Sequence, residues 1–233
     1  MPPTFRDDLL QVRSPGMNFY VLKDAFGLYL IDAGFIAGPF LLRRALRRRG
    51  WGSEPVRGII VTHGHLDHIL NVAVVARETG AWIAAPRIDA AYYSGHARYT
   101  GRTRITGVLE AIGRAVLGFR SFTPTRWIDD GDFLDVWHGL QAVNLPGHTA
   151  GQMGFYCARL KLLFTADLFA THYGITRLPP DVFNSEPERI PGSIARALSF
   201  DLEGVLPNHC DHAPPDVQLR RLRWLAERLA AAG

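Results

Sequence analysis

Cysteine and long apolar runs are both scarce in this chain of 233 residues. The only two cysteines, Cys157 and Cys210, are too few for a disulfide framework, so we expect reduced thiols. No apolar run approaches the roughly 20 residues that a membrane-spanning helix needs, and we expect no bilayer span. Residues 1–8 lack the basic start and the apolar stretch of a secretion signal, so we expect a cytoplasmic protein.

The composition is typical of a globular protein. Hydrophobic residues make up 47% of the chain and charged residues 21%, which provides enough apolar material for a large core and too little charge for a disordered chain. The sequence contains no fixed-period repeat, low-complexity tract or long linker. We therefore predict a single domain over residues 1–233, with two pseudo-halves of about 1–125 and 126–233.

Positive charge is concentrated in residues 90–128. The whole chain has a net charge of +4, whereas this segment alone carries +5, because Glu110 is its only acidic residue. A helix expected at 106–119 has one wide apolar stripe, which predicts that it packs on the sheet or on the partner subunit of a homodimer, unless it covers a functional site. The arginines would then either attract an anionic substrate or stay solvated. The stripe consists of Val108, Leu109, Ile112, Ala115, Val116 and Phe119, and the arginines are Arg98, Arg102, Arg104, Arg114, Arg120 and Arg126.

The expected elements follow different patterns in the two halves. The first half alternates strands and helices, and its apolar strand at residues 56–61 is predicted to be buried on both faces. From Arg126 onward, short strands separated by turn residues indicate an antiparallel sheet. An α+β fold follows, with two sheets packed together and helices outside. The expected strands cover residues 17–23, 27–32, 56–61, 81–85, 127–128, 133–137, 140–145, 152–157, 160–165 and 205–206, and the expected helices cover residues 39–49, 66–78, 106–119, 186–199 and 216–232.

The strongest chemical signal lies directly after the predicted strand 56–61. Residues 63–68 are His-Gly-His-Leu-Asp-His, which places four residues of metal-ligating types within six positions. Side chains two apart in an extended segment point the same way, so His63 and His65 can bind one ion. Asp67 and His68, at the start of a helix, can turn toward a second ion. The pattern therefore predicts a site for two metal ions.

This run of residues resembles the HxHxDH signature of the metallo-β-lactamase superfamily. Four further segments resemble other motifs of that family, in the family's order along the chain: Ile31–Gly34, Pro146–Gly151, Phe164–Asp167 and Leu206–His209. The resemblance covers essentially the whole chain. It implies a four-layer αββα sandwich, in which residues 90–128 form a cover or side wall near the metals.

The resemblance also implies ligands for two metal ions. Imidazole and carboxylate ligands suit two zinc ions and also tolerate iron or manganese. Asn208 stands where the family has glycine, so the last histidine ligand is either His209, which we favour from its position after a strand, or His212. The implied ligands are His63, His65 and His148 for the first ion, Asp67, His68 and His209 for the second, and Asp167 as a bridge between them.

The sequence also gives expectations for five residues outside the implied ligand set. We expect Cys210 to be a buried structural thiol, with a metal ligand or a reactive thiol as alternatives. His172 and Tyr173 lie on a loop expected near the metals, where they either contact substrate or pack within the loop. His96 and His138 have no partner pattern and are expected at the surface.

A metal-dependent hydrolase is the function that the resemblance implies. A hydroxide activated by two zinc ions would attack the carbonyl of an ester, thioester or lactone, with Asp67 as general acid and base. We expect a small-molecule substrate, which is anionic if the arginines attract it. The core is similar to that of glyoxalase II, although no glutathione-binding C-terminal domain is recognisable.

Two alternatives belong to other functional classes. One is a mononuclear iron persulfide dioxygenase on the same scaffold, which would use His63, His148 and Asp167. The other is a non-catalytic, nucleic-acid-binding relative that uses the basic residues 90–128. A complete ligand set disfavours the nucleic-acid-binding alternative, because such a protein would have no need of it.

Overall fold

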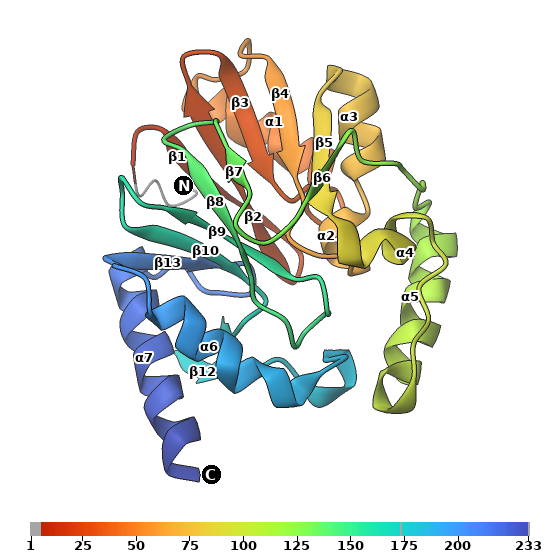
Figure 1. Cartoon of the computed structure of the whole chain (residues 1–233). Helices are drawn as coiled ribbons and strands as arrows, with labels where there is room; N and C mark the ends of the chain where they lie inside the picture. The colour runs from red at the N-terminus through yellow and green to blue at the C-terminus, as the bar shows by residue number, and fades with distance from the viewer. Residues whose placement is uncertain (1–5, 173, 233) are drawn as a thin grey trace.

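The computed structural model describes residues 6–172 and 174–232, which form two β-sheets packed face to face (Figure 1). The first sheet has six strands in the order β1-β2-β3-β4-β5-β6. The first three strands are antiparallel, and β3 to β6 are parallel. Their bounds are β1 (Leu9–Ser14), β2 (Met17–Asp24), β3 (Gly27–Ile31), β4 (Val56–Ile60), β5 (Trp82–Pro86) and β6 (Arg126–Ile128).

The second sheet has five strands in the order β13-β10-β9-β8-β7. It is antiparallel except for the pair β10 and β13, which is parallel. A separate two-stranded ribbon follows β10. The bounds are β7 (Phe133–Leu134), β8 (Leu140–Asn144), β9 (Met153–Cys157), β10 (Leu162–Ala166) and β13 (Gly204–Pro207), with β11 (Ala170–His172) and β12 (Ile175–Arg177) in the ribbon.

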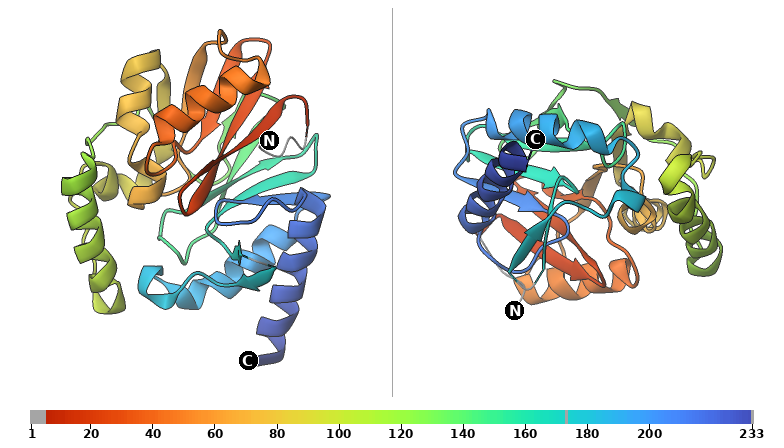
Figure 2. Two further views of the ribbon diagram at one scale, coloured as in Figure 1. Left: turned by 180° about the vertical axis from the view of Figure 1, so that it is seen from behind. Right: turned by 90° about the horizontal axis from the view of Figure 1, so that it is seen from below.

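Helices cover the outer faces of both sheets, which gives the four-layer αββα sandwich (Figures 1 and 2). Helices α1 (Gly38–Arg49) and α3 (Val72–Thr79) pack on the first sheet, and α6 (Ile190–Leu198) and α7 (Pro215–Ala232) pack on the second. The predicted fold class is thus confirmed. No helix within the described ranges is long and apolar enough to cross a bilayer. The remaining helices are α2 (Leu66–Ile69), α4 (Ala90–Tyr93) and α5 (Arg104–Leu117), with short 3₁₀ turns η1 (Arg87–Asp89), η2 (Gly101–Thr103), η3 (Asp181–Phe183) and η4 (Pro187–Arg189).

The core between the sheets is made by alternate side chains of facing strands. Tyr20 on β2 contacts Phe164 on β10 edge to face, with ring centroids 5.3 Å apart, and both side chains are fully buried. Phe155 on β9 belongs to the same cluster. Burying an aromatic side chain of this size contributes about 1.5–3 kcal/mol, so this layer fixes the relative position of the strand ends that carry the site.

Three sequence-based predictions differ from the structure. The sequence analysis did not predict strand β1, which precedes β2 and is separated from it by a turn at Pro15 and Gly16. The helix predicted over 66–78 is instead two helices, α2 and α3, with Asn71 at their junction. The Asn71 side chain donates to the carbonyls of Gly34 (2.7 Å) and Phe35 (2.6 Å), which anchors this junction to the loop after β3. Strand β6, expected in the antiparallel half, pairs in parallel with β5 in the first sheet.

Most of the apolar stripe of α5 faces outward, so the stripe does not pack on the sheet, and its packing on a partner subunit stays a prediction. Val108 and Val116 are 60% and 76% exposed, and the inward face instead buries Thr106 and Glu110. Polar contacts explain this orientation: Glu110 accepts hydrogen bonds from the Tyr99 hydroxyl (2.6 Å) and from the Leu66 backbone N–H (3.1 Å). The helix therefore projects from the body of the protein (Figures 1 and 2).

Candidate metal centre

Histidine and aspartate side chains from four separate segments meet at one edge of the sandwich. The segments are the loop after β4 together with α2, the loop after β8, the end of β10 and the residues after β13. Ligands on loops at strand ends are held by the rigid sheets without belonging to the core. The segments contribute His63, His65, Asp67 and His68, then His148, then Asp167, and finally His209.

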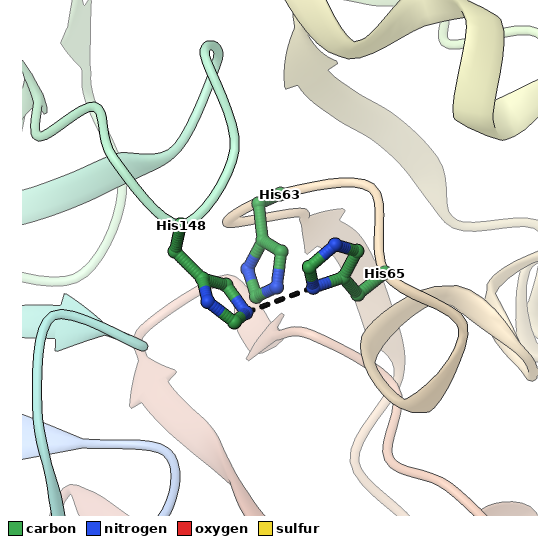
Figure 3. A group of neighbouring side chains, drawn as sticks. All are labelled: His63, His65 and His148. Carbon is green, nitrogen blue, oxygen red and sulfur yellow. Dashed lines mark hydrogen bonds between the residues drawn. The ribbon is translucent and has the colours of Figure 1, made fainter. Parts of the chain in front are cut away.

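The first group consists of His63, His65 and His148, whose rings point toward a common centre (Figure 3). One ligand atom from each lies within 4.8 Å of the others. His65 Nδ1 and His148 Nε2 are 2.8 Å apart, although they come from different loops. Three imidazole nitrogens in this arrangement are a donor set of the kind that binds zinc.

The second group consists of Asp67, His68 and His209, and it adjoins the first. Asp167 lies between the two groups: its oxygens are 3.2 Å from His148 Nε2, 3.3 Å from His68 Nε2 and 3.0 Å from His209 Nε2. The carboxylate is thus within reach of both groups.

Polar atoms without partners support the fit of metal ions to this cluster. His63 Nε2, His68 Nε2 and Asp167 Oδ1 are buried and make no hydrogen bond to any described residue. Leaving such atoms unpaired costs about 1–3 kcal/mol each, so a cation that satisfies them is strongly favoured. The nitrogen and carboxylate donors fit zinc, and they also tolerate iron or manganese.

His209 rather than His212 reaches the cluster. His209 Nε2 lies 3.2 Å from Asp67 Oδ2, and its Nδ1–H donates to the Gly16 carbonyl (2.8 Å). His212 is exposed and contacts Arg13 instead. The structure therefore brings together all seven residues that the sequence analysis assigned as ligands.

Asp32 is a buried carboxylate that holds the second group in place. Its oxygens accept hydrogen bonds from His68 Nδ1–H (2.8 Å), from the backbone and hydroxyl of Thr62 (both 2.8 Å) and from the Asn208 amide (2.9 Å). The asparagine that replaces the family's glycine is therefore part of this network. A carboxylate behind a ligating histidine fixes its tautomer and ring orientation.

A second buried carboxylate, Asp89, joins the two loops of the first group. It accepts hydrogen bonds from the Gly64 N–H (2.9 Å), the Thr149 hydroxyl (2.7 Å) and the Gly151 N–H (3.0 Å). Burial raises the pKa of Asp89 to about 6, although these three hydrogen bonds act in the opposite direction. The sequence analysis missed this residue, because a lone aspartate outside the motifs gives no signal in one sequence.

Asn184 is a further residue that the motifs did not indicate. Its Oδ1 accepts a hydrogen bond from His148 Nδ1–H (2.8 Å), and its own amide donates to the Pro179 carbonyl (2.9 Å). His148 therefore presents Nε2 to the cluster. The contact also ties the ligand to the segment after β12, far from it in sequence.

The pKa values of the clustered histidines are shifted in opposite directions. Burial holds the pKa values of His63 and His65 well below the usual range, so these rings are neutral and suited to ligation. Burial would also lower the pKa of His68, but Asp167, Asp67 and Asp32 outweigh it and raise that pKa well above normal. The acidic side of the cluster thus attracts positive charge.

The two cysteines play no part in the cluster. Cys210 is 4% exposed, and its Sγ accepts hydrogen bonds from Asn18 (3.4 Å) and Gln11 (3.5 Å). Burial raises its pKa to about 12, which removes the reactive thiolate at neutral pH. Cys157 is fully buried. Both residues are structural thiols, as predicted for Cys210.

A cavity of about 500 Å³ opens above the cluster. Its floor includes Asp67 and His209, and its wall includes His172, so the prediction that this histidine lies near the metals agrees with the structure. Arg177 also lines the cavity and makes no ion pair with any described residue. Tyr173, predicted to lie beside His172, is outside the described residues.

The arginines of residues 90–128 have other surroundings. Arg114 forms an ion pair with Glu110 (2.9 Å), and Arg102 pairs with Asp181 (3.3 Å) at the surface. Arg98 and Arg104 are exposed and do not line the cavity. Of the other histidines, His96 is exposed as predicted, whereas His138 is half-buried and its Nε2 lies 2.6 Å from Asp8.

Known proteins with similar sequences include two hydroxyacylglutathione hydrolases. A hydroxyacylglutathione hydrolase of Brucella ovis is 29% identical over 203 residues, which cover 84% of this chain and 64% of that protein. One from Chelativorans sp. (strain BNC1) is 27% identical over 170 residues, which cover 72% of this chain and 51% of that protein. The chain thus spans about half to two thirds of the length of these relatives.

Similar solved structures share the fold. A metallo-beta-lactamase family protein from Thermus thermophilus superposes with a TM-score of 0.71 over 97% of this chain and 81% of that chain, at 19% sequence identity. The family model of the metallo-beta-lactamase superfamily matches residues 16–218, which include all seven clustered side chains. The protein therefore belongs to the metallo-beta-lactamase superfamily.

Proposed function

We propose that this protein is a metal-dependent hydrolase that cleaves an ester, thioester or lactone bond of a small molecule. The observation that carries the proposal is the cluster of seven histidine and aspartate side chains at the floor of an open cavity. The relatives named as hydroxyacylglutathione hydrolases support a hydrolytic reaction.

Two zinc ions are the proposed cofactors. His63, His65 and His148 would hold one ion, Asp67, His68 and His209 the other, and Asp167 would bridge them. When bound, such ions supply Lewis-acid activation of water and stabilise developing negative charge.

Asp67 is the proposed general acid and base. Its side chain is 29% exposed and lines the cavity, whereas the side chain of Asp167 is 5% exposed. A carboxylate open to the cavity can accept a proton from a nucleophilic water and return it to the leaving group. Asp32 and Asp89 hold the neighbouring loops and stay out of the cavity.

The substrate is proposed to be a small anionic molecule. Arg177 supplies a cationic group in the cavity wall without an acidic partner among the described residues. An exposed arginine attracts a carboxylate or phosphate in the substrate by a charge-assisted contact. We also propose that the protein acts in the cytoplasm.

Metal content and stoichiometry of the protein purified without added metal test this proposal, followed by a panel of esters, thioesters and lactones. Two first-row metal ions per chain and turnover of at least one bond class are the expected results. One iron ion per chain, with consumption of oxygen and a persulfide, would instead support the dioxygenase alternative. The absence of bound metal would contradict both.

A further inference from the structure

The cavity has two chemically different parts. Its floor is the cluster of histidine and aspartate side chains, whereas its walls are mainly apolar, with Leu66 and Leu109 on one side and Phe169 and Phe183 on another. Leu66 lies between the ligands His65 and Asp67 in sequence. The apolar wall therefore begins directly beside the floor.

Helix α5 presents Leu109 to the cavity because polar contacts set its orientation. The Thr106 hydroxyl donates to the Val182 carbonyl, and Glu110 accepts from the Leu66 N–H (3.1 Å). These two residues are one turn apart and face inward. Leu109, between them and next to Glu110, is 56% exposed and lies at the opening of the cavity.

Close packing keeps this side of the cavity in place. A side chain at Gly113 would meet Leu66 Cδ2 at 2.7 Å, so glycine allows α5 to approach α2. At the other end of the helix, Arg102 pairs with Asp181 next to Phe183. Helix α5 and turn η3 thus form a continuous wall that runs outward from the metal cluster.

We propose that this wall binds an extended aliphatic chain of the substrate, so that the preferred substrates are esters or thioesters with a medium-length alkyl chain. The proposal rests on the proposed function for the bond that is cleaved, but not for the binding of the chain. Leu109 is the exposed residue of this lining, at 56%, whereas Leu66 and Phe169 are 5% and 0% exposed. An apolar ligand that covers such a lining removes apolar surface from water. The chain belongs either to the acyl group or to the alcohol.

Hydrolysis of two homologous ester series tests the proposal. One series lengthens the acyl group from acetate to octanoate with a constant alcohol, and the other lengthens the alcohol with a constant acetyl group. We expect kcat/KM to rise up to about fourfold per methylene in one series, which corresponds to ~0.8 kcal/mol for each buried CH₂. The series that responds identifies which part of the substrate occupies the wall.

Two exposed positions on α5 give a matched pair of variants. Leu109→Gln places an amide in the wall, and Val116→Gln makes the same kind of change on a side chain that is 76% exposed and does not line the cavity. We expect Leu109→Gln to flatten the chain-length dependence and Val116→Gln to leave it unchanged. A flat wild-type response in both series, or equal effects of the two variants, would overturn the proposal.

Binding measurements separate this proposal from the proposed function. Calorimetry with decanoate and butanoate on the metal-loaded protein requires no turnover, and the shared carboxylate cancels its own contribution. Decanoate is expected to bind at least tenfold more tightly than butanoate, and Leu109→Gln should remove most of that difference. Equal affinities would refute the alkyl site even if esters were hydrolysed, whereas a preference for decanoate without any hydrolysis would refute only the proposed reaction.

Discussion

The floor of the cavity is made of hydrogen-bonded polar side chains, whereas its wall is mainly apolar. In the floor, buried polar side chains such as Asp32, Asp89 and Asn184 each make two or more hydrogen bonds that hold ligand loops. In the wall, apolar side chains line the cavity, and of these Leu109 on α5 is 56% exposed, whereas Leu66 and Phe169 are buried. Under the proposed function, the polar network of the floor would position the reactive groups, whereas the apolar wall would select the substrate.

Removing a floor ligand should have the largest effect. We expect Asp167→Ala and His148→Ala to lower kcat/KM on the order of 10³-fold or more, because each removes a ligand that lies between or within the groups. The fold should persist, since both residues lie on loops at strand ends. Ester hydrolysis, metal content and circular dichroism provide the measurements.

His96→Ala is the matched control, because this histidine is exposed and belongs to none of the metal-ligand motifs. It should retain wild-type activity and metal content. Full activity in His148→Ala would show that the cluster is not the reactive site, and the comparison between floor and wall would lose its basis.

Asp89→Ala should have an intermediate effect on the floor. Without the carboxylate, the Gly64 N–H and the Thr149 hydroxyl lose their common acceptor, and the two loops of the first group are no longer joined. We expect metal affinity or activity to fall about 10–100-fold, as for other residues that support metal ligands. Competition with a chelator measures the affinity.

Asp129→Ala is the control for Asp89→Ala, because its carboxylate is exposed and pairs with Arg87 on the surface. An Asp89→Ala protein that bound metal as tightly as this control would indicate that the loops are held by the sheets alone. The rigid network would then be confined to Asp32 and Asn184.

The smallest effect is expected from the charge in the wall. Arg177→Gln should lower kcat/KM about 1.4- to fivefold for esters that carry a carboxylate, because exposed ion pairs contribute ~0.2–1 kcal/mol. Neutral esters should be unaffected, and the difference should shrink in high salt. Arg98→Gln, which alters an exposed arginine outside the cavity, is the matched control.

The opposite pattern would change the interpretation of the basic segment. If replacing Arg98, Arg102 and Arg104 together lowered the rate for anionic esters as much as Arg177→Gln does, the field of residues 90–128 would steer the substrate. The charge selectivity would then arise outside the cavity wall.

The metal ligands were predictable from the sequence because they lie in short motifs at strand ends. His63, His65, Asp67 and His68 occupy one run, and the turn after the strand leaves them little freedom. Their partners were not predictable in the same way. Asp89 and Asn184 act across 60 and 36 residues of sequence, and only the folded sheets bring them to Thr149 and His148.

Of the three predictions for the stripe of α5, packing on the sheet was wrong for a related reason. Hydrophobic periodicity assumes that the apolar face of a helix is buried. Here the buried face is chosen by Glu110, which satisfies the Leu66 N–H and the Tyr99 hydroxyl, and by Gly113, which permits close approach. Tertiary hydrogen bonds thus outweighed the local pattern, whereas the predicted sandwich followed the strands correctly.

The contact between Glu110 and Leu66 joins the two parts of the cavity through one backbone amide. The amide that Glu110 binds lies between the ligands His65 and Asp67, so a movement of α5 is transmitted to both. Any ligand whose binding to the wall shifts this helix alters metal affinity, and by reciprocity bound metal alters the affinity for that ligand to the same degree. Metal affinity measured with and without a wall ligand therefore tests whether wall and floor are coupled.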